Sequence, residues 1–275
     1  MTVETPAVPR VRGRRPAQGD PVVDRALSLL AAFDARHRTM SLGELSRRSE
    51  IPASSALRLA NRLVAWGALE RGTDGRFTVG LRLWEVASLA PRAQDLRQVA
   101  LPFMRDLEDV THQHVLLAVR DGSDALLVER LSARQAMPVL YRVGGRLPLH
   151  STGVGLVLLA FADLDVQEEI LAQPLMHQPE NVPVSPAALR RQLAEVRRDG
   201  AATVRRRVPQ PLMTVAAPVF DIQDQVIAAL SVVVPQEHAE PRPLVTAVRA
   251  VARSVSRILG AQRAVGAPPL LRGGG

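Results

Sequence analysis

Apolar positions between residues 23 and 64 recur with the spacing of short amphipathic helices. The first predicted helix starts near Asp20 and has one apolar face with i, i+3, i+4, i+7 spacing: Val23, Ala26, Leu27, Leu30 and Phe33. A second helix is predicted from Ser41 to about Ser49, because Ser41 and Glu44 form a capping-box pattern. Pro52 opens a third helix, and its apolar stripe is made by Ala56, Leu59, Ala60, Leu63 and Val64.

The pattern changes after Gly67 to two short strand-like runs within "LERGTDGRFTV". The Asp74-Gly75 pair between them is a strong hairpin signal. Three helices followed by a small hairpin is the element order of a winged helix-turn-helix. Residues 81 to 90, "LRLWEVASLA", then predict a helical connector that ends at Pro91.

From residue 92 onward, predicted helices alternate with strand-like runs. The helices are expected at about 92–111, 151–161, 185–199 and 241–262. The strands are expected in "HVLLAVRDGSDALLVERL", a hairpin around Asp121-Gly122, in "MPVLYRV", in "LPLH" up to His150, and in "LMTVAAPVF" and "QVIAALSVVV". Helices that frame a mostly antiparallel sheet indicate an α+β fold class.

The chain therefore divides into five predicted segments. Residues 1–19 are rich in Pro, Gly and Arg without apolar periodicity, which is typical of a disordered basic arm. Residues 20–80 form the winged helix-turn-helix domain, residues 81–91 the linker helix and residues 92–262 the second domain. A flexible tail is expected at residues 263–275.

Charge adds a candidate partner to this picture. All 35 basic residues are arginines, because the 275-residue chain contains no lysine, and the net charge is +8. Residues 1–80 hold 13 arginines against 8 acidic residues, whereas residues 81–275 hold 22 against 19. The denser positive charge at the amino end favours a polyanionic partner there.

Composition also excludes several kinds of chemistry. The lack of cysteine excludes disulfides, thiolate catalysis and cysteine metal sites. Without lysine there is no P-loop, and neither Gly-x-Ser-x-Gly nor Gly-x-Gly-x-x-Gly occurs. His112 and His114 are a candidate metal pair, but no nearby Glu or Cys completes a ligand set, which favours helix-end and strand-surface histidines. We expect no cofactor and no metal.

The sequence shows neither a secretory signal peptide nor a membrane-spanning segment. The opening residues lack the apolar segment of a secretory signal, and no apolar stretch approaches the roughly 18 residues that span a bilayer. We therefore expect a cytoplasmic protein without a membrane partner.

The outward face of the third predicted helix carries no acidic residue before Glu70. An ordinary solvated face would usually hold pairs of opposite charge. Hydroxyls, an amide and arginines instead suit phosphate contacts and base-edge hydrogen bonds in a DNA major groove. The candidate DNA contacts on this face are Ser54, Ser55, Arg58, Asn61 and Arg62.

Two further candidate DNA contacts have open alternatives. Leu57 either touches a thymine methyl or packs within the protein. Arg76, on the wing, either meets phosphate or a minor groove or is simply solvated. The arm segment "RVRGRRP" either enters a minor groove or is mobile.

A ligand site is predicted at "LPLHSTGVG". Ser151 or Thr152 caps a helix whose first turn contains Gly153 and Gly155. Free amides and the helix dipole favour an anion there, and glycine lets it approach the backbone. The alternative is a plain capped helix whose glycines serve packing.

Several motifs together make the chain recognisable. "VDRALSLLAAF", "LSRRSEIPASSALRLANRLVAWGALER" and "GRFTVGLRLWEV" resemble the amino-terminal half of the IclR family of bacterial transcriptional regulators. "GGRLPLHSTGVGLVLLAF" and "VAAPVFDIQDQVIAALSV" resemble motifs of its second half, so the resemblance covers about residues 21–262. This chain has Ala53-Ser54-Ser55 where the family usually has Lys-Ser-Thr, and Leu57 where it has histidine.

The resemblance implies a winged helix-turn-helix that binds a double-stranded DNA operator, a linker helix and a GAF-like sensor domain with a mostly antiparallel sheet. It implies that residues 92–262 bind a small-molecule effector and assemble the chain into a homodimer or homotetramer. Repression is the more common behaviour in the family.

By the same resemblance, the effector contacts fall on Val154, Gly155, Val204, Thr214, Ser231 and Val233. At Val204, Thr214 and Val233 the family more often has an acid, a cysteine and a serine. A less polar pocket predicts a larger, partly apolar acidic effector, with Arg205, Arg206 or Arg207 available to its carboxylate.

Two other functions are weighed against the regulator. One is a small-molecule-processing α+β enzyme with an incidental basic amino-terminal domain, and the other is a pure oligomerisation module. The first lacks a recognisable catalytic motif, and the second leaves the arginine-bearing helix without a purpose. We expect a DNA-binding regulator and no enzyme.

Overall fold

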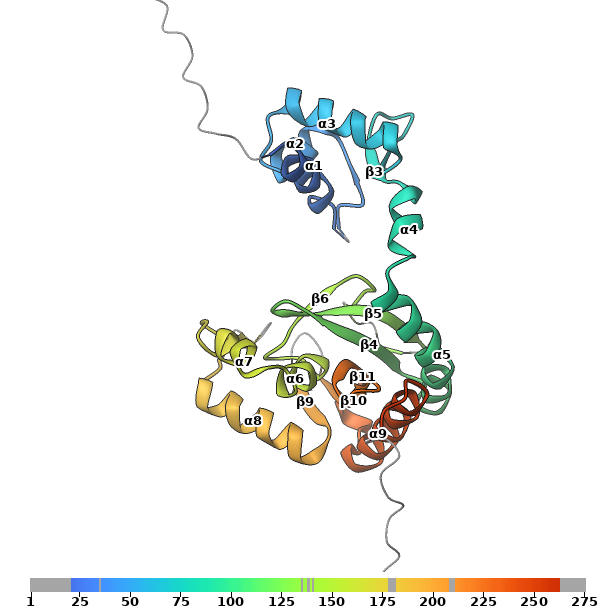
Figure 1. Cartoon of the computed structure of the whole chain (residues 1–275), viewed down its shortest axis with the longest axis vertical. Coiled ribbons are helices and arrows are strands. Elements are labelled where there is room, and N and C mark those ends of the chain that lie inside the picture. The colour runs from blue at the N-terminus through green and yellow to red at the C-terminus, as the bar shows by residue number, and fades with distance from the viewer. Residues whose placement is uncertain are drawn as a thin grey trace, which may run out of the picture. The chain divides into compact units, whose positions relative to one another are not determined.

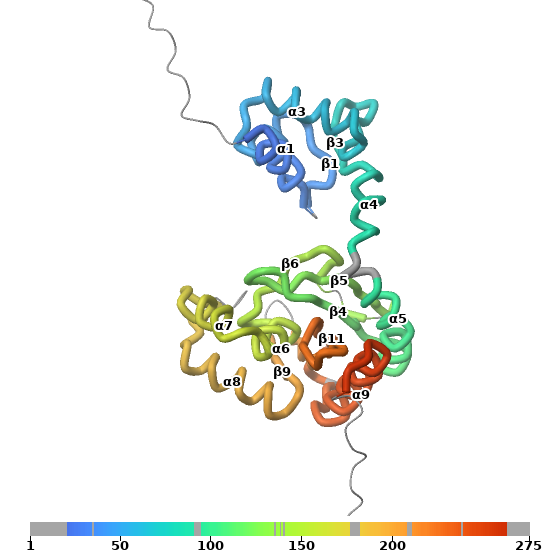
Figure 2. The backbone as a smooth tube through the Cα atoms, in the orientation of Figure 1, coloured from blue at the N-terminus to red at the C-terminus, as the bar shows by residue number. Residues whose placement is uncertain are grey.

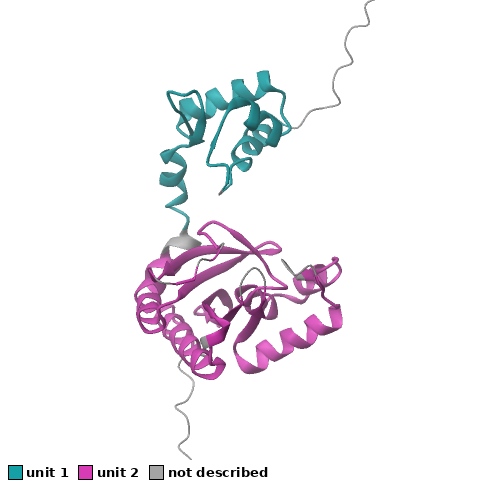
Figure 3. Cartoon of the chain, turned by 180° about the vertical axis from the view of Figure 1, so that it is seen from behind, with its two compact units in different colours: residues 1–90 teal, residues 91–275 magenta. Residues whose placement is uncertain are grey.

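A computed structural model describes residues 21–262, apart from residues 35, 135, 138, 140, 178–181 and 208–210, with the backbone alone at 91–94 and 238. The chain splits into two compact units, residues 1–90 and 91–275 (Figure 3). The predicted arm at residues 1–19 and the predicted tail at residues 263–275 lie outside the described residues.

The first unit is a winged helix-turn-helix, as predicted (Figure 1). Its helices are α1 (Val22–Ala31), α2 (Leu42–Arg48), α3 (Ala53–Trp66) and α4 (Leu81–Ala87). A three-stranded antiparallel sheet has the order β1-β3-β2, from β1 (Thr39–Met40), β2 (Leu69–Arg71) and β3 (Phe77–Val79). Strand β1 was not predicted from the sequence.

Local sequence explains where these helices begin and end. Ser41 and Glu44 form the expected capping box, because the hydroxyl of Ser41 accepts from the Glu44 amide while the Glu44 carboxylate accepts from the Ser41 amide at 2.8 Å. Helix α3 ends at Gly67, whose φ of 90° lies in the left-handed region that favours glycine. Leu29, Met40, Leu45, Leu59 and Phe77 meet in one buried core beneath the helices.

The second unit is an α+β domain built on one antiparallel sheet of the order β6-β5-β4-β11-β10-β9. Its strands are β4 (His114–Asp121), β5 (Asp124–Ser132), β6 (Arg146–Pro148), β9 (Ala202–Arg206), β10 (Leu212–Phe220) and β11 (Val226–Pro235). Its helices are α5 (Pro91–Thr111), α6 (Gly153–Ala160), α7 (Leu164–Leu171), α8 (Pro186–Asp199) and α9 (Pro241–Ile258). A small two-stranded ladder joins β7 (Met176–His177) and β8 (Val182–Pro183).

Helices cover both faces of the six-stranded sheet (Figures 1 and 2). Helices α5 and α9 pack together over one face, where Met104, Leu117 and Val248 are buried. Helices α6 and α8 cover the other face, where Leu127, Leu159 and Leu193 are buried. Two cores, one on each face, account for the near-continuous apolar run of β11.

Some predicted boundaries were wrong. The described residues of "MPVLYRV" are not in a strand, and β5 instead pairs with Arg146–Pro148. Met137, Val139 and Tyr141 are apolar because they pack on the core from a connecting segment. The strand ends at Pro148 and not at His150, and α6 begins at Gly153 with Thr152 as its cap.

The sequence prediction also missed α7, β7, β8 and β9. Strand β9 is a sheet edge with two arginines in five residues, and charged edge strands lack the apolar alternation that a pattern search requires. Within the described residues, no helix combines the length and apolar character needed to cross a membrane.

Candidate functional site

The turn between α2 and α3 is fixed by a buried anchor. Ile51 is only 6% exposed and belongs to the core of the first unit. Its amide donates to the carbonyl of Ser46 at 3.1 Å, and its carbonyl accepts from the Ser46 hydroxyl at 2.6 Å. Glu50 adopts a φ of 57°, which reverses the chain within the turn. These contacts hold α3 at a set angle to α2.

The outward face of α3 is the one predicted to read DNA. Ser54, Arg58, Asn61 and Arg62 are exposed and Ser55 is half-buried. The opposite stripe, made by Ala56, Leu59 and Ala60, is buried.

No hydrogen bond or ion pair holds the side chains of Arg58 and Arg62 within the described part of the chain. Four residues apart on one helix, they project from the same face. Helix α3 contains no acidic residue that would neutralise them.

Leu57 and Arg76 are placed differently from the rest of the predicted DNA contacts. Leu57 is half-buried and packs against the core of the first unit, which favours its packing alternative. Arg76 donates to the carbonyl of Thr39 at 3.0 Å and to the carboxylate of Glu44 at 3.1 Å. Hydrogen bonds from Ser41 lower the pKa of Glu44, and the charge of Arg76 lowers it further. Arg76 therefore ties the wing to α2 and is not presented to solvent as a free cation.

The register of the second sheet gathers residues far apart in sequence on the face below α6. Thr214 pairs with Val204 on one side and with Val233 on the other, which forms one row. Ser231 pairs with Leu116 in the next row, and Arg206 pairs with Leu212 in the row on the opposite side. Because side chains alternate along a strand, these three rows share one face.

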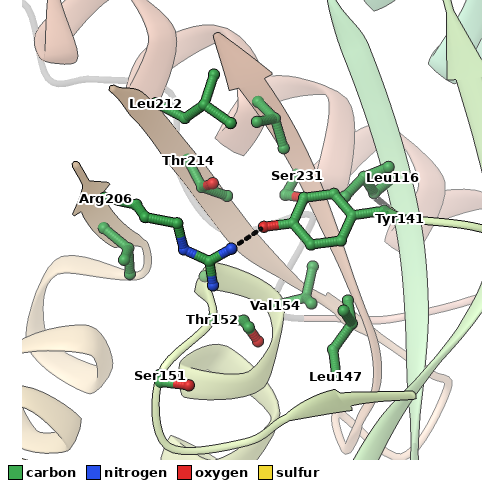
Figure 4. A pocket seen from close by; sticks show the side chains of 13 residues that line it. Leu116, Tyr141, Leu147, Ser151, Thr152, Val154, Arg206, Leu212, Thr214 and Ser231 are labelled. Atoms are coloured by element: carbon green, nitrogen blue, oxygen red, sulfur yellow. Dashed lines mark hydrogen bonds between the residues drawn. The ribbon is translucent and has the colours of Figure 1, made fainter. Parts of the chain in front are cut away.

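The cavity on this face is closed by the start of α6 and by the segments before it (Figure 4). Its lining includes five of the six residues predicted to contact an effector: Val154, Val204, Thr214, Ser231 and Val233. It also includes four residues of the predicted ligand segment "LPLHSTGVG": Leu147, Ser151, Thr152 and Gly153. Leu116, Tyr141 and Leu212 also line it and were not selected from the sequence. Arg206 is the member of the Arg205–Arg207 run that lines it.

Polar groups in this cavity are few and specific. Among the described residues, Arg206 is the one charged residue in its lining, and its Nη1 donates to the Tyr141 hydroxyl at 3.2 Å. The hydroxyls of Ser151 and Ser231 are buried and have no hydrogen-bond partner among the described atoms. Buried polar groups are normally satisfied, so two unpartnered hydroxyls around one cavity indicate a site that accepts polar ligand atoms.

Gly155 does not line the cavity. Its amide donates to the Thr152 hydroxyl at 3.1 Å, so it is not free for an anion. A Cβ on Gly155 would lie 2.4 Å from the carbonyl oxygen of Pro148, and one on Gly153 would lie 2.7 Å from Cγ2 of Thr214. Both glycines therefore allow the start of α6 to lie close to Pro148 and Thr214. This is the alternative in which the glycines of the first turn serve packing.

We expect Gly155→Ala to destabilise the second unit by about 1–3 kcal/mol, because its methyl group would overlap backbone atoms that cannot easily move. Scanning calorimetry would detect this as a lower unfolding temperature for the second unit. Gly43→Ala in α2 is the control, since its added Cβ meets nothing within 4 Å. An unchanged transition for Gly155→Ala would contradict the packing role.

The two histidines considered as a metal pair, His112 and His114, occupy different positions in the structure. His112 follows the end of α5 with a φ of 51°. The Nδ1 of His114 lies 2.9 Å from the Ser132 hydroxyl, and its Nε2 meets the carbonyl of Met137. Across the described residues, no three side chains of metal-ligating type gather at one point.

A winged helix-turn-helix joined to an α+β unit with a partly apolar cavity is the architecture of one-component transcriptional regulators. Two family models match this chain: "IclR helix-turn-helix domain" over residues 22–72 and "Bacterial transcriptional regulator IclR C-terminal" over residues 89–257. The chain belongs to the IclR family of DNA-binding transcriptional regulators, as the sequence motifs indicated.

Characterised relatives span most of the chain. It is 27% identical to the HTH-type transcriptional repressor AllR of Escherichia coli K12 over 263 residues, which cover 91% of this chain and 97% of AllR. It is 29% identical to the Pca regulon regulatory protein of Pseudomonas putida over 218 residues, or 76% of this chain and 72% of that protein. These relatives are transcriptional regulators.

Among solved structures, an IclR homolog of Microbacterium hydrocarbonoxydans complexed with 4-hydroxybenzoate is 37% identical, with a TM-score of 0.82. That match covers 87% of this chain and 99% of the homolog. An IclR homolog of Microbacterium sp. strain HM58-2 is 36% identical with a TM-score of 0.57, over 89% of this chain and all of the homolog.

Proposed function

We propose that this regulator reads a double-stranded DNA operator through Ser54, Ser55, Arg58, Asn61 and Arg62 of α3. The main support for this proposal is the exposed face of α3, which follows the turn anchored by Ile51. This face carries Arg58 and Arg62, and no described group neutralises their charges. Arginine is the side chain that most often reads guanine edges, while serine and asparagine suit phosphates and adenine. Such a protein acts on the chromosome in the cytoplasm. We propose that it is a repressor, because the related AllR of Escherichia coli is named a transcriptional repressor.

We propose further that the cavity beneath α6 binds a small, partly apolar acid as effector. Arg206 supplies the one cation of the lining, and Leu116, Leu147, Val204, Leu212 and Val233 supply apolar walls. A pocket of this kind holds a carboxylate at one point and an apolar body elsewhere. The 4-hydroxybenzoate bound by the Microbacterium homolog is an acid of this type.

We expect aromatic or branched carboxylic acids to raise the melting temperature, and Arg206→Leu to weaken their binding about 10- to 100-fold, since a hydrogen bond to a charged group contributes about 1.5–3 kcal/mol. Thermal shift followed by calorimetry would measure both effects. Arg205→Leu is the matched control, because Arg205 is exposed and lies outside the lining. Stabilisation by two- or three-carbon oxoacids alone would reject this class of effector.

We propose that the regulator works as a homodimer, or as a homotetramer of paired dimers. Helix α4 has no buried residue, and Leu81, Trp84 and Leu89 on and after it are 72%, 66% and 78% exposed. A seven-residue helix is marginal by itself, so an apolar helix of this length needs a covering partner. A second copy of the chain supplies one and also provides the second recognition helix for a paired half-site.

A further inference from the structure

The effector cavity is too small for its proposed ligand as it stands. Its volume is about 20 Å³, which is room for little more than one water molecule. A benzene-sized ligand needs a cavity on the order of 150 Å³. A side chain that now fills the site must therefore leave it when an aromatic acid enters.

Tyr141 is the lining side chain best placed to move out of the cavity. Figure 4 shows the Tyr141 ring and the Arg206 side chain reaching toward each other from opposite sides of the cavity, where they meet in a hydrogen bond of 3.2 Å. The neighbouring walls Leu116, Val204 and Leu212 belong to strands, so the ladder fixes their backbone. Tyr141 belongs to no strand or helix.

The backbone at Tyr141 is nevertheless anchored. Its carbonyl accepts a hydrogen bond from Nη1 of Arg130, which lies on β5. A rotation about the side-chain bonds therefore moves the phenol ring without requiring the strand next to it to shift. Rotation of one side chain is a fast and inexpensive motion compared with remodelling a sheet.

We propose that the Tyr141 ring occupies the place of the effector ring, and that binding exchanges one for the other. This inference rests on the proposed effector site. Arg206 stops donating to a phenol oxygen and donates instead to the ligand carboxylate, which forms the stronger, charge-assisted hydrogen bond. The effector then binds the state in which the Tyr141 ring has left the cavity, and not the state in which the ring fills it. An effector response requires such a difference in affinity between two protein states.

The exchange also defines the ligand class more closely. The ligand is a planar aromatic carboxylate with a second hydrogen-bonding group on its ring. The second group has partners available, because the buried hydroxyls of Ser231 and Ser151 line the same cavity and have no hydrogen-bond partner among the described residues. An acid without a ring would leave the space vacated by Tyr141 unfilled, which costs packing energy.

The chain offers a direct probe, since Tyr141 is its one tyrosine. Full-length protein labelled with 3-fluorotyrosine gives a single ¹⁹F resonance that reports the environment of this ring. Titration with 4-hydroxybenzoate is expected to move that resonance toward its solvent-exposed position, with pyruvate as the comparison. Calorimetry on the same samples measures binding independently.

Two variants complete the test. Tyr141→Phe removes the hydroxyl that competes for Arg206 and is expected to bind 4-hydroxybenzoate about 2- to 10-fold more tightly. Tyr141→Ala removes the ring and is expected to bind it with a faster association rate. Circular dichroism establishes that both variants are folded.

The outcomes separate the two proposals. If calorimetry shows binding while the ¹⁹F resonance stays in place, the ring exchange is wrong and the effector site stands. Association rates unchanged in Tyr141→Ala would overturn the exchange as well. If no aromatic acid binds either the native protein or Tyr141→Ala, the effector class itself fails and the exchange fails with it.

Discussion

The double variant Arg58→Ala, Arg62→Ala is expected to lose most of its preference for the operator over unrelated DNA. Each bidentate arginine–base contact contributes about 1–3 kcal/mol of discrimination, so losing both lowers operator preference by roughly 30-fold or more. The operator is first obtained by selecting genomic fragments on the purified protein. Competition between operator and unrelated duplex at one fixed salt concentration then measures the preference.

A matched control separates base reading from a general loss of charge. Arg191→Ala removes an arginine that is also exposed, from α8 in the other unit, and we expect it to keep the full operator preference. Single variants at Arg58 and Arg62 divide the effect between the two positions. Full discrimination in a correctly folded double variant would mean that another surface of the protein reads the DNA.

The exposed polar face of α3, which we propose reads DNA, was predictable from sequence because it depends on local information. The stripe of Ala56, Leu59 and Ala60 and the exposed side of Arg58 and Arg62 both follow from the period of one helix. The capping residues Ser41 and Glu44 likewise lie within one turn of each other. The ion pair of Arg76 with Glu44 was not predicted, because the two residues lie 32 positions apart, beyond any local pattern; a DNA contact by Arg76 stays a prediction.

The cavity proposed for the effector was predictable only in part, because strand register creates it. The row of Val204, Thr214 and Val233 came from family resemblance, and the pairing of β9, β10 and β11 explains why those positions meet. Alternation along β9 would have selected Arg206 over its neighbours, since Val204 and Arg206 point to one face. The sequence did not indicate that Tyr141 lines the cavity. Its segment has the apolar pattern of a strand, but in the structure it is a connecting segment that packs against the core.

The proposed homodimer needs a surface that holds two recognition helices together, and the first unit carries an exposed apolar surface suited to that. The start of α4 is tied to its own unit, because the Leu81 amide donates to Glu70 at 3.2 Å and Arg82 donates to the Trp66 carbonyl at 3.1 Å. The guanidinium of Arg82 also lies 4.7 Å from the centre of the Trp66 ring. These contacts fix the helix while leaving Trp84 uncovered.

Trp84→Glu is therefore expected to weaken self-association about 30- to 1,000-fold and to lower operator affinity with it. Buried tryptophans at the centre of an interface contribute about 2–4 kcal/mol or more, and a charge placed there adds a desolvation cost. Operator affinity falls because a dimer engages two half-sites at high effective concentration, whereas a monomer engages one. Sedimentation equilibrium measures the association, and a duplex with one half-site measures the intrinsic contact.

Leu164→Glu is the control, because Leu164 is 74% exposed on α7 and the charge change is the same. We expect it to leave the oligomer formed through α4 intact. Binding of Trp84→Glu to the single half-site should match that of the native protein, since α3 is untouched. A Trp84→Glu protein that still dimerises and binds its operator with native affinity would exclude α4 as the surface that pairs the recognition helices.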